Sequence, residues 1–97
     1  VLVNNAGTNR PAPFHEVTPA DFDAVMDLNL RAAFFAAQAV VKRMIVEGVK
    51  GSVINISSQM GHVGGPDRGA YCASKWAMEG WTKAMAIDLA RFGIRAN

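Results

Sequence analysis

The sequence contains a single cysteine, Cys72, and only two histidines, His15 and His62. One cysteine can form no internal disulfide, which excludes the disulfide frameworks that stabilise many small secreted domains. The two distant histidines and the cysteine also lack the spacing of a metal site. We therefore expect neither a disulfide-bonded module nor a bound metal.

Charge is also sparse, since charged residues make up 19% of the chain and the net charge is +2. The basic residues are scattered along the chain, so they form no patch typical of nucleic-acid binding. Lys42, Arg43 and Glu47 interrupt the longest apolar stretches, so we expect no run to approach the roughly 18 residues of a membrane span. No charged leader or signal-peptide pattern is present. These features favour a cytoplasmic protein without nucleic-acid or membrane partners.

What is present is typical of a globular chain, since 51% of the 97 residues are apolar. A domain of this size is marginal because its surface is large relative to its volume. The sequence starts at Val1 without a methionine and stops at Asn97, where an extended segment begins. We expect residues 1–97 to be one piece of a longer chain, truncated at both ends. We also expect the isolated piece to aggregate or stay molten, because its outer strands lack neighbours.

Hydrophobic patterning and turn residues predict alternating strands and helices. Thr18 and Pro19 are typical of a helix start, because threonine can cap the first turn and proline suits the first helical position. Gly48 and Gly93 are typical of helix ends. The expected elements are a strand at Val1–Val3, a helix from Thr18 to about Glu47, a strand at Gly51–Ser58, a helix from about Tyr71 to Phe92, and a strand beginning at Ile94. This order predicts an α/β fold in which helices cover a parallel sheet.

Ligands of open parallel sheets bind outside the carboxyl ends of the strands. Two such ends occur here, at Asn4–Gly7 and at Ser57–Gly61, and both consist mainly of small and polar residues. Small residues let the backbone approach a ligand closely. We therefore expect the functional site at these two segments.

Asn29 interrupts the apolar face of the first helix. The apolar residues that recur there at helical spacing are Phe22, Val25, Met26, Ala32, Ala33, Ala36, Val40 and Met44. A buried amide without partners costs about 1–3 kcal/mol. Asn29 therefore either is satisfied by a backbone carbonyl or a water, or serves a functional site.

Tyr71 and Lys75 lie four residues apart, so they share one face of the second helix. A free phenol keeps its proton at neutral pH, and a neighbouring ammonium favours the phenolate. The pair is a candidate for general acid–base catalysis, although this spacing also arises by chance.

Ser57 and Ser58 stand 14 and 13 residues before Tyr71, and the loop between them is short enough to bring a hydroxyl beside the phenol. Such a hydroxyl can orient and polarise a substrate carbonyl. Strand-end capping is the alternative, and we favour it for Ser57. Nucleophilic catalysis would need His15 or His62 as a base, and the serines lie in no Gly-x-Ser-x-Gly elbow.

Together, these residues resemble the short-chain dehydrogenase/reductase family over essentially the whole chain. The matching features are the Asn4-Asn5-Ala6-Gly7 segment, the mid-helix Asn29, Ser58 at 13 residues before the tyrosine, the Tyr-x-x-x-Lys motif Tyr71-Cys72-Ala73-Ser74-Lys75, and Gly93-Ile94-Arg95-Ala96-Asn97, where the family more often has valine in place of Ala96. The resemblance implies the central catalytic portion of an NAD(P)-binding, Rossmann-like domain with a doubly wound parallel sheet.

The resemblance also implies residue roles. Tyr71 would be the general acid in carbonyl reduction and the general base in alcohol oxidation. Lys75 would favour its phenolate and hydrogen-bond the nicotinamide ribose. Ser58 would position the substrate oxygen, and Asn29 would hold a water that links Lys75 to solvent.

The implied cofactor is NAD or NADP, and the residues that would line its path are Asn5, Ala6, Gly7, Tyr71 and Lys75. The glycine-rich turn that holds the pyrophosphate, and the residue that selects between the two cofactors, would lie upstream of this chain. The hydride would pass between nicotinamide and substrate carbon, so the protein supplies placement and protons.

The implied activity is the interconversion of a small secondary alcohol and a ketone, as in 3-oxoacyl-carrier-protein reductases or sugar and polyol dehydrogenases. A catalytically silent nucleotide-binding regulator, and an epimerase or dehydratase that recycles its cofactor, are alternatives on the same scaffold. The resemblance further implies a homodimer or homotetramer in which the two long helices pair across subunits. Small residues that would permit this approach are Ala32, Ala36, Ala73, Ala77, Gly80 and Ala84.

Overall fold

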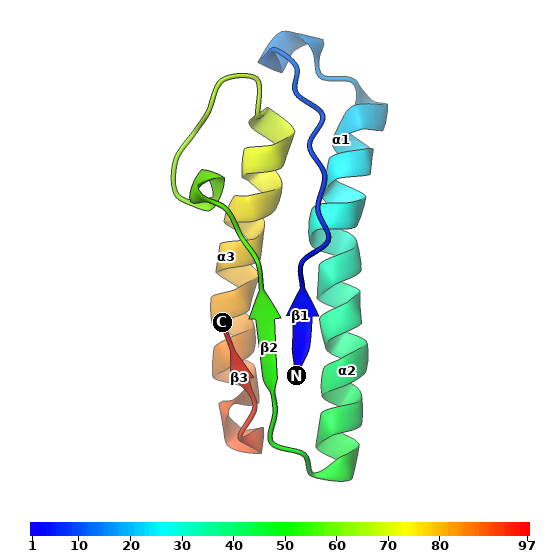
Figure 1. Cartoon of the computed structure of the whole chain (residues 1–97), viewed down its shortest axis with the longest axis vertical. Helices are drawn as coiled ribbons and strands as arrows, with labels where there is room; N and C mark the ends of the chain where they lie inside the picture. The colour runs from blue at the N-terminus through cyan, green and yellow to red at the C-terminus, as the bar shows by residue number, and fades with distance from the viewer.

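The computed structural model describes all 97 residues and contains a three-stranded parallel sheet with two long helical stretches (Figure 1). The strands are β1 (Leu2–Asn4), β2 (Ser52–Asn55) and β3 (Arg95–Ala96), arranged in the order β1-β2-β3. Val3 pairs with Ile54, and Val53 pairs with Ala96. The predicted α/β fold is confirmed.

The first helical stretch runs from Pro19 to Glu47 in three parts, namely α1 (Pro19–Met26), a π-helical segment (Asp27–Ala32) and α2 (Ala33–Glu47). The Thr18 side chain accepts a hydrogen bond from Asp21 N at 3.1 Å, which confirms the predicted cap. Gly48 ends the stretch in the left-handed conformation, with φ of 65°. The π-helical segment was not predicted, because the spacing of apolar residues does not reveal one extra residue inside a helix.

The second helix, α3 (Gly69–Leu89), begins two residues before the predicted start and passes into a 3₁₀ turn at Ala90–Phe92. Two further 3₁₀ turns, at Phe14–Glu16 and Gln59–Gly61, lie outside the predicted helices and strands or at their edges. β2 is shorter than predicted, since its ladder with β1 ends where Asn55 pairs with Asn4.

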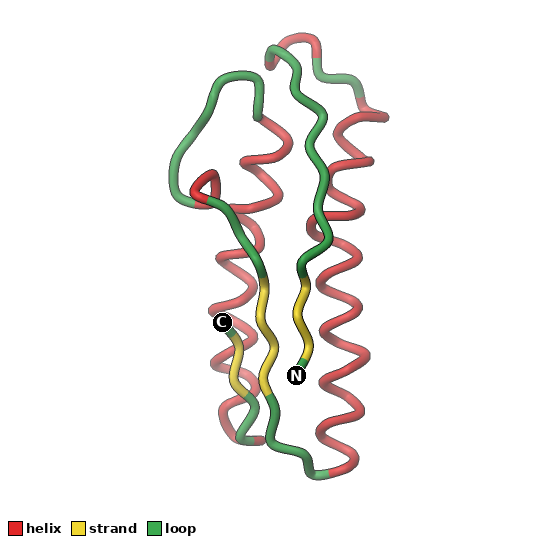
Figure 2. Tube along the Cα trace, in the orientation of Figure 1, coloured by secondary structure: helices red, strands yellow, loops and turns green.

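Both long helices lie along the same face of the sheet (Figures 1 and 2). The core between them and the sheet consists of Ala37, Val41, Met44, Val53, Leu89 and Ile94. No helix covers the opposite face, where Val3 remains 51% exposed. Only 16 of the 97 residues are buried, because a single layer of helices covers a single face. The expectation that the isolated piece is not stably packed stays a prediction.

The buried face of the first helical stretch differs from the expected one. Its buried members are Val25, Asn29, Ala33, Ala37, Val41 and Met44. Ala32 and Ala36, which were expected on this face, are exposed. The extra residue in the π-helical segment moves every later side chain about one position around the helix, so the buried series continues at Ala33 rather than Ala32.

One further expectation needs correction. On α3, Trp76 is 54% exposed, whereas Met78 is buried and Trp81 packs against the core. By length and composition alone, the stretch Pro19–Glu47 could cross a membrane, with a mean hydropathy of 1.3 over its most apolar window. The expectation that no run approaches that length was therefore wrong. The core helix of a soluble protein can have the same length and composition, and one face of this helix packs on the sheet.

Candidate active site

Two segments leave the carboxyl ends of β1 and β2 at the same end of the molecule (Figure 2). Between them and the first turns of α3 lies a pocket of about 520 Å³. The residues that line it are Asn5, Gly7, Thr8, Asn9, Ile56, Ser57, Ser58, Gln59, Met60, Arg68, Tyr71 and Lys75. A pocket therefore lies at the edge of the sheet where the strand order predicts a site.

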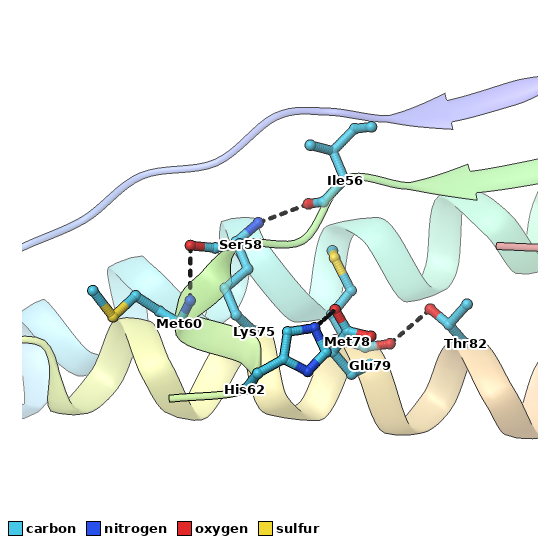
Figure 3. Close-up of polar contacts among 8 residues, drawn as sticks. All are labelled: Ile56, Ser58, Met60, His62, Lys75, Met78, Glu79 and Thr82. Atoms are coloured by element: carbon cyan, nitrogen blue, oxygen red, sulfur yellow. Dashed lines mark hydrogen bonds and ion pairs between the residues drawn. The ribbon is translucent and has the colours of Figure 1, made fainter. Parts of the chain in front are cut away.

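Lys75 is 5% exposed and extends from α3 to the end of β2, where its Nζ donates a hydrogen bond of 2.9 Å to Ile56 O (Figure 3). The same Nζ lies 5.8 Å from the centroid of the Tyr71 ring. An ammonium has three donors, and the Ile56 carbonyl uses one of them. The buried cation is thus fixed beside the phenol ring and keeps donors for a ligand in the pocket.

Ser58 follows β2 and lines the same pocket as Tyr71. Its Oγ accepts a hydrogen bond of 3.1 Å from Met60 N, which caps the 3₁₀ turn at Gln59–Gly61 (Figure 3). Because the hydroxyl oxygen is the acceptor in that bond, its own proton is free to be donated into the pocket. Ser57 Oγ is buried without a partner. The capping role expected of Ser57 therefore belongs to Ser58, and that expectation was wrong.

Asn29 is fully buried behind the pocket, in the π-helical segment. Its Oδ1 accepts a hydrogen bond of 2.8 Å from Thr8 N, and its Nδ2 donates to Thr8 O at 2.8 Å and to Ser74 Oγ at 3.1 Å. The Thr8 carbonyl thus satisfies the buried amide, which confirms the first interpretation of Asn29, that a backbone carbonyl would be its partner. The water that Asn29 would hold stays a prediction.

The Asn5–Gly7 segment is divided between two sides of the chain. Asn5 and Gly7 line the pocket, whereas Ala6 contributes only to a smaller hollow against the first helical stretch, where Leu28 is also found. A Cβ atom at Gly7 would stand 3.4 Å from Asn29 Oδ1 and 3.8 Å from Lys75 Nζ. The missing side chain therefore leaves space directly in front of the lysine.

The structure thus brings Asn5, Gly7, Ser58, Tyr71 and Lys75 to one pocket wall. Asn29 supports that wall from behind, and Ala6 does not reach it. Neither histidine lines the pocket. His62 is exposed, and its Nε2 lies 3.5 Å from Glu79 Oε1 (Figure 3). No histidine is therefore placed to serve a nucleophilic serine.

Sequence reasoning missed a chain of amides that crosses the sheet beneath the pocket. Asn4 Nδ2 donates to Asn55 Oδ1 at 2.8 Å and to Ala33 O at 3.1 Å. Asn55 Nδ2 donates to Thr82 Oγ1 at 2.8 Å, which in turn donates to Met78 O at 2.6 Å. These bonds connect β1 and β2 to α2 and α3. A polar residue at the last position of each apolar strand was the available signal.

A parallel sheet with a polar pocket at the carboxyl ends of its strands, and with helices packed along its face, defines a domain of the Rossmann type. The chain belongs to the short-chain dehydrogenase family, whose family model matches residues 1–97.

Curated relatives agree with this assignment. The chain is 42% identical over 97 residues to carbonyl reductase (NADPH) 2 of Sus scrofa, covering 100% of this chain and 40% of the relative. It is 40% identical to gluconate 5-dehydrogenase of Gluconobacter oxydans, covering 100% of this chain and 38% of that protein. The chain therefore spans about two fifths of the length of the curated relatives it matches.

Solved structures show the same fold. A 4-hydroxyisoleucine dehydrogenase complexed with NADH superposes with a TM-score of 0.97 at 38% identity, covering 99% of this chain and 42% of the other. A gluconate 5-dehydrogenase from Burkholderia cenocepacia, in complex with NADP and tartrate, superposes with a TM-score of 0.95 at 45% identity, covering 99% of this chain and 37% of the other.

Proposed function

We propose that the complete protein containing this chain is an NAD(P)-dependent oxidoreductase that interconverts a small secondary alcohol and a ketone. The observation that carries the proposal is the gathering of Ser58, Tyr71 and Lys75 around one pocket at the carboxyl ends of the strands. Relatives and structural neighbours named as dehydrogenases and reductases support it. No observation favours the catalytically silent alternative.

Tyr71 is the proton-transfer group of this proposal. Its phenol is half-buried in the pocket wall, one helical turn from the buried Lys75. In this proposal the phenol, with the lysine Nζ 5.8 Å from its ring centroid, gives a proton to a carbonyl oxygen and recovers it from an alcohol. Ser58 donates its free hydroxyl proton to the same oxygen and thereby fixes the orientation of the substrate.

The pocket also fits part of a nicotinamide cofactor. The space left by Gly7 lies in front of Lys75 Nζ, which keeps donors for ribose hydroxyls. Asn5, Gly7, Tyr71 and Lys75 would line the cofactor, whereas Ala6 lies outside this pocket. NAD or NADP, when bound, supplies the hydride that the reaction needs. Structural neighbours solved with NADH or NADP support this assignment.

We further propose a cytoplasmic homodimer or homotetramer. An apolar hollow of about 270 Å³ lies between α2 and α3, and its walls include Phe34, Val41, Trp81 and Ala84. Trp81 Nε1 is buried there without a hydrogen-bond partner. The same two helices are those expected to pair across subunits.

The test is turnover by the complete protein, followed by nicotinamide absorbance over a panel of secondary alcohols and ketones. We expect NAD(H)- or NADP(H)-dependent turnover with at least one class of compound. Tyr71→Phe should abolish turnover and leave cofactor binding, measured by nicotinamide fluorescence, within about twofold of the unchanged protein. Full activity of the Tyr71→Phe protein would contradict the proposed mechanism.

A further inference from the structure

The wall of the active-site pocket carries positive charge and no carboxylate. Among its 12 lining residues, Arg68 and Lys75 are the only charged side chains. The Lys75 ammonium is buried and donates to Ile56 O. Arg68 takes part in none of the four ion pairs of the structure. Arg68 therefore lines the pocket without forming an ion pair with any carboxylate of the chain.

Neighbouring contacts fix the backbone at Arg68. Its carbonyl accepts a hydrogen bond of 2.8 Å from Cys72 N, and the preceding Asp67 carbonyl accepts one of 3.1 Å from Ala12 N. The side chain is half-buried, and its Cδ lies 3.5 Å from the point where a Cβ would stand at Gly65. The stem of the arginine therefore packs against the loop that follows Ser58, while the residue forms part of the pocket wall.

Arg68 also has a defined relationship to the reacting group. It is the N-cap residue of α3 and precedes Tyr71 by three residues, so the two are close to one helical turn apart. Both line the pocket that holds Ser58. A substrate whose oxygen lies at Tyr71 and Ser58 therefore occupies the same pocket that Arg68 lines.

We propose that Arg68 is a specificity-determining residue that binds a carboxylate of the substrate, so that the enzyme acts on hydroxy acids and oxo acids in preference to neutral alcohols and ketones. This inference rests on the proposed function. A guanidinium presents a planar fork of donors that matches a carboxylate with two hydrogen bonds. Because the pocket wall holds no aspartate or glutamate, no side chain in that wall competes for this position.

The test compares six-carbon oxo acids, with the carbonyl at the second to fifth carbon, with their primary amides. The complete protein should prefer at least one acid over its amide by about tenfold or more in kcat/KM. Arg68→Gln should lower kcat/KM for that acid by about 10- to 100-fold and change the value for the amide by less than about threefold. For Arg68→Lys, kcat/KM for the acid should lie between the values of the unchanged protein and of Arg68→Gln, because lysine keeps the positive charge but lacks the planar pair of donors.

Arg43→Gln is the matched control, since Arg43 pairs with Glu47 at the far end of α2 and lies outside the pocket. Arg43→Gln should change kcat/KM for neither the acid nor the amide. An equal loss for acid and amide in Arg68→Gln would overturn the proposal, because it would assign a structural role to Arg68. A loss of cofactor affinity with an unchanged ratio of acid to amide would overturn it as well.

A binding measurement separates this inference from the proposed function. Hexanoate should raise the melting temperature of the complete protein more than hexanamide does, and this difference should vanish in Arg68→Gln. Absence of turnover with every alcohol and ketone would contradict the proposed function, while the hexanoate result would still support carboxylate binding by Arg68. Equal effects of hexanoate and hexanamide on the unchanged protein would overturn the inference.

Discussion

The side-chain amide of Asn29 pairs with the main chain of Thr8 through two hydrogen bonds of 2.8 Å each. This is the pattern by which an amide replaces a neighbouring strand, since both the N–H and the C=O of one residue are satisfied. Thr8 belongs to the segment that leaves β1 and lines the pocket. Asn29 therefore fixes one pocket wall to the first helical stretch.

Asn29→Ala should destabilise the complete protein by roughly 2–4 kcal/mol, because it removes three hydrogen bonds at a fully buried position and leaves the Thr8 groups without partners. Urea unfolding measures this change. Asp23→Ala, at an exposed position on α1, is the control and should stay within about 0.5 kcal/mol. Equal stabilities of the two variants would show that the Thr8 contacts contribute nothing.

Lys75→Met should lower turnover by about 100-fold or more while the protein remains folded. Methionine fills much of the same buried space, but it cannot donate to Ile56 O and carries no positive charge beside the Tyr71 ring. Steady-state kinetics and circular dichroism together give the result. Retained turnover would remove Lys75 from the proposed proton-transfer machinery.

Gly61→Ala should destabilise the protein by about 1–3 kcal/mol through overpacking. A Cβ at Gly61 would stand 2.8 Å from Ser57 Oγ and 3.2 Å from the Lys75 carbonyl, so the turn capped by Ser58 would have to move away from α3. We therefore also expect a lower kcat. Gly64→Ala is the matched control, because no atom lies within 4 Å of its added Cβ. Thermal unfolding of both variants measures the difference in stability. Equal melting temperatures of Gly61→Ala and Gly64→Ala would contradict the prediction.

Ala84→Arg should convert the proposed oligomer into a smaller species. Ala84 is exposed and lines the apolar hollow between α2 and α3, so an arginine there would place a charge and added bulk against a pairing subunit. Size-exclusion chromatography with light scattering reports the mass. Ala20→Arg, at an exposed position in the first turn of α1, should leave the mass unchanged. A monomeric unchanged protein would refute the proposed assembly itself.

The elements could be predicted because each has a local cause. Thr18 and Gly48 define the ends of the first helical stretch by capping and by a left-handed conformation, and both are visible as residue types. The parallel sheet followed from the alternation of strands and helices. Strand lengths did not follow, because the end of β2 depends on where its partner β1 stops pairing.

The site could be predicted in part for a similar reason. The segments after β1 and β2 had to meet because parallel strands end at one edge of the sheet. The side of the chain that each residue faces depends on backbone torsions, so the direction of Ala6 and the unpartnered Ser57 could not be inferred. Arg68 was missed since an arginine in a loop is ordinary in sequence, and only folding places it in a wall without carboxylates.

The π-helical segment at Asp27–Ala32 gives the first helical stretch two different registers. Val25, before the segment, is buried at one angular position around the helix axis. Ala37 and Val41, after it, are buried at another. Deleting one residue from the segment would restore a regular helix and rotate everything beyond by about 100°. The buried alanines and valine of α2 would then turn outward. The one extra residue in the π-helical segment therefore lets Asn29 face Thr8 while the buried residues of α2 face the sheet. A regular α-helix over the same stretch could not satisfy both contacts at once.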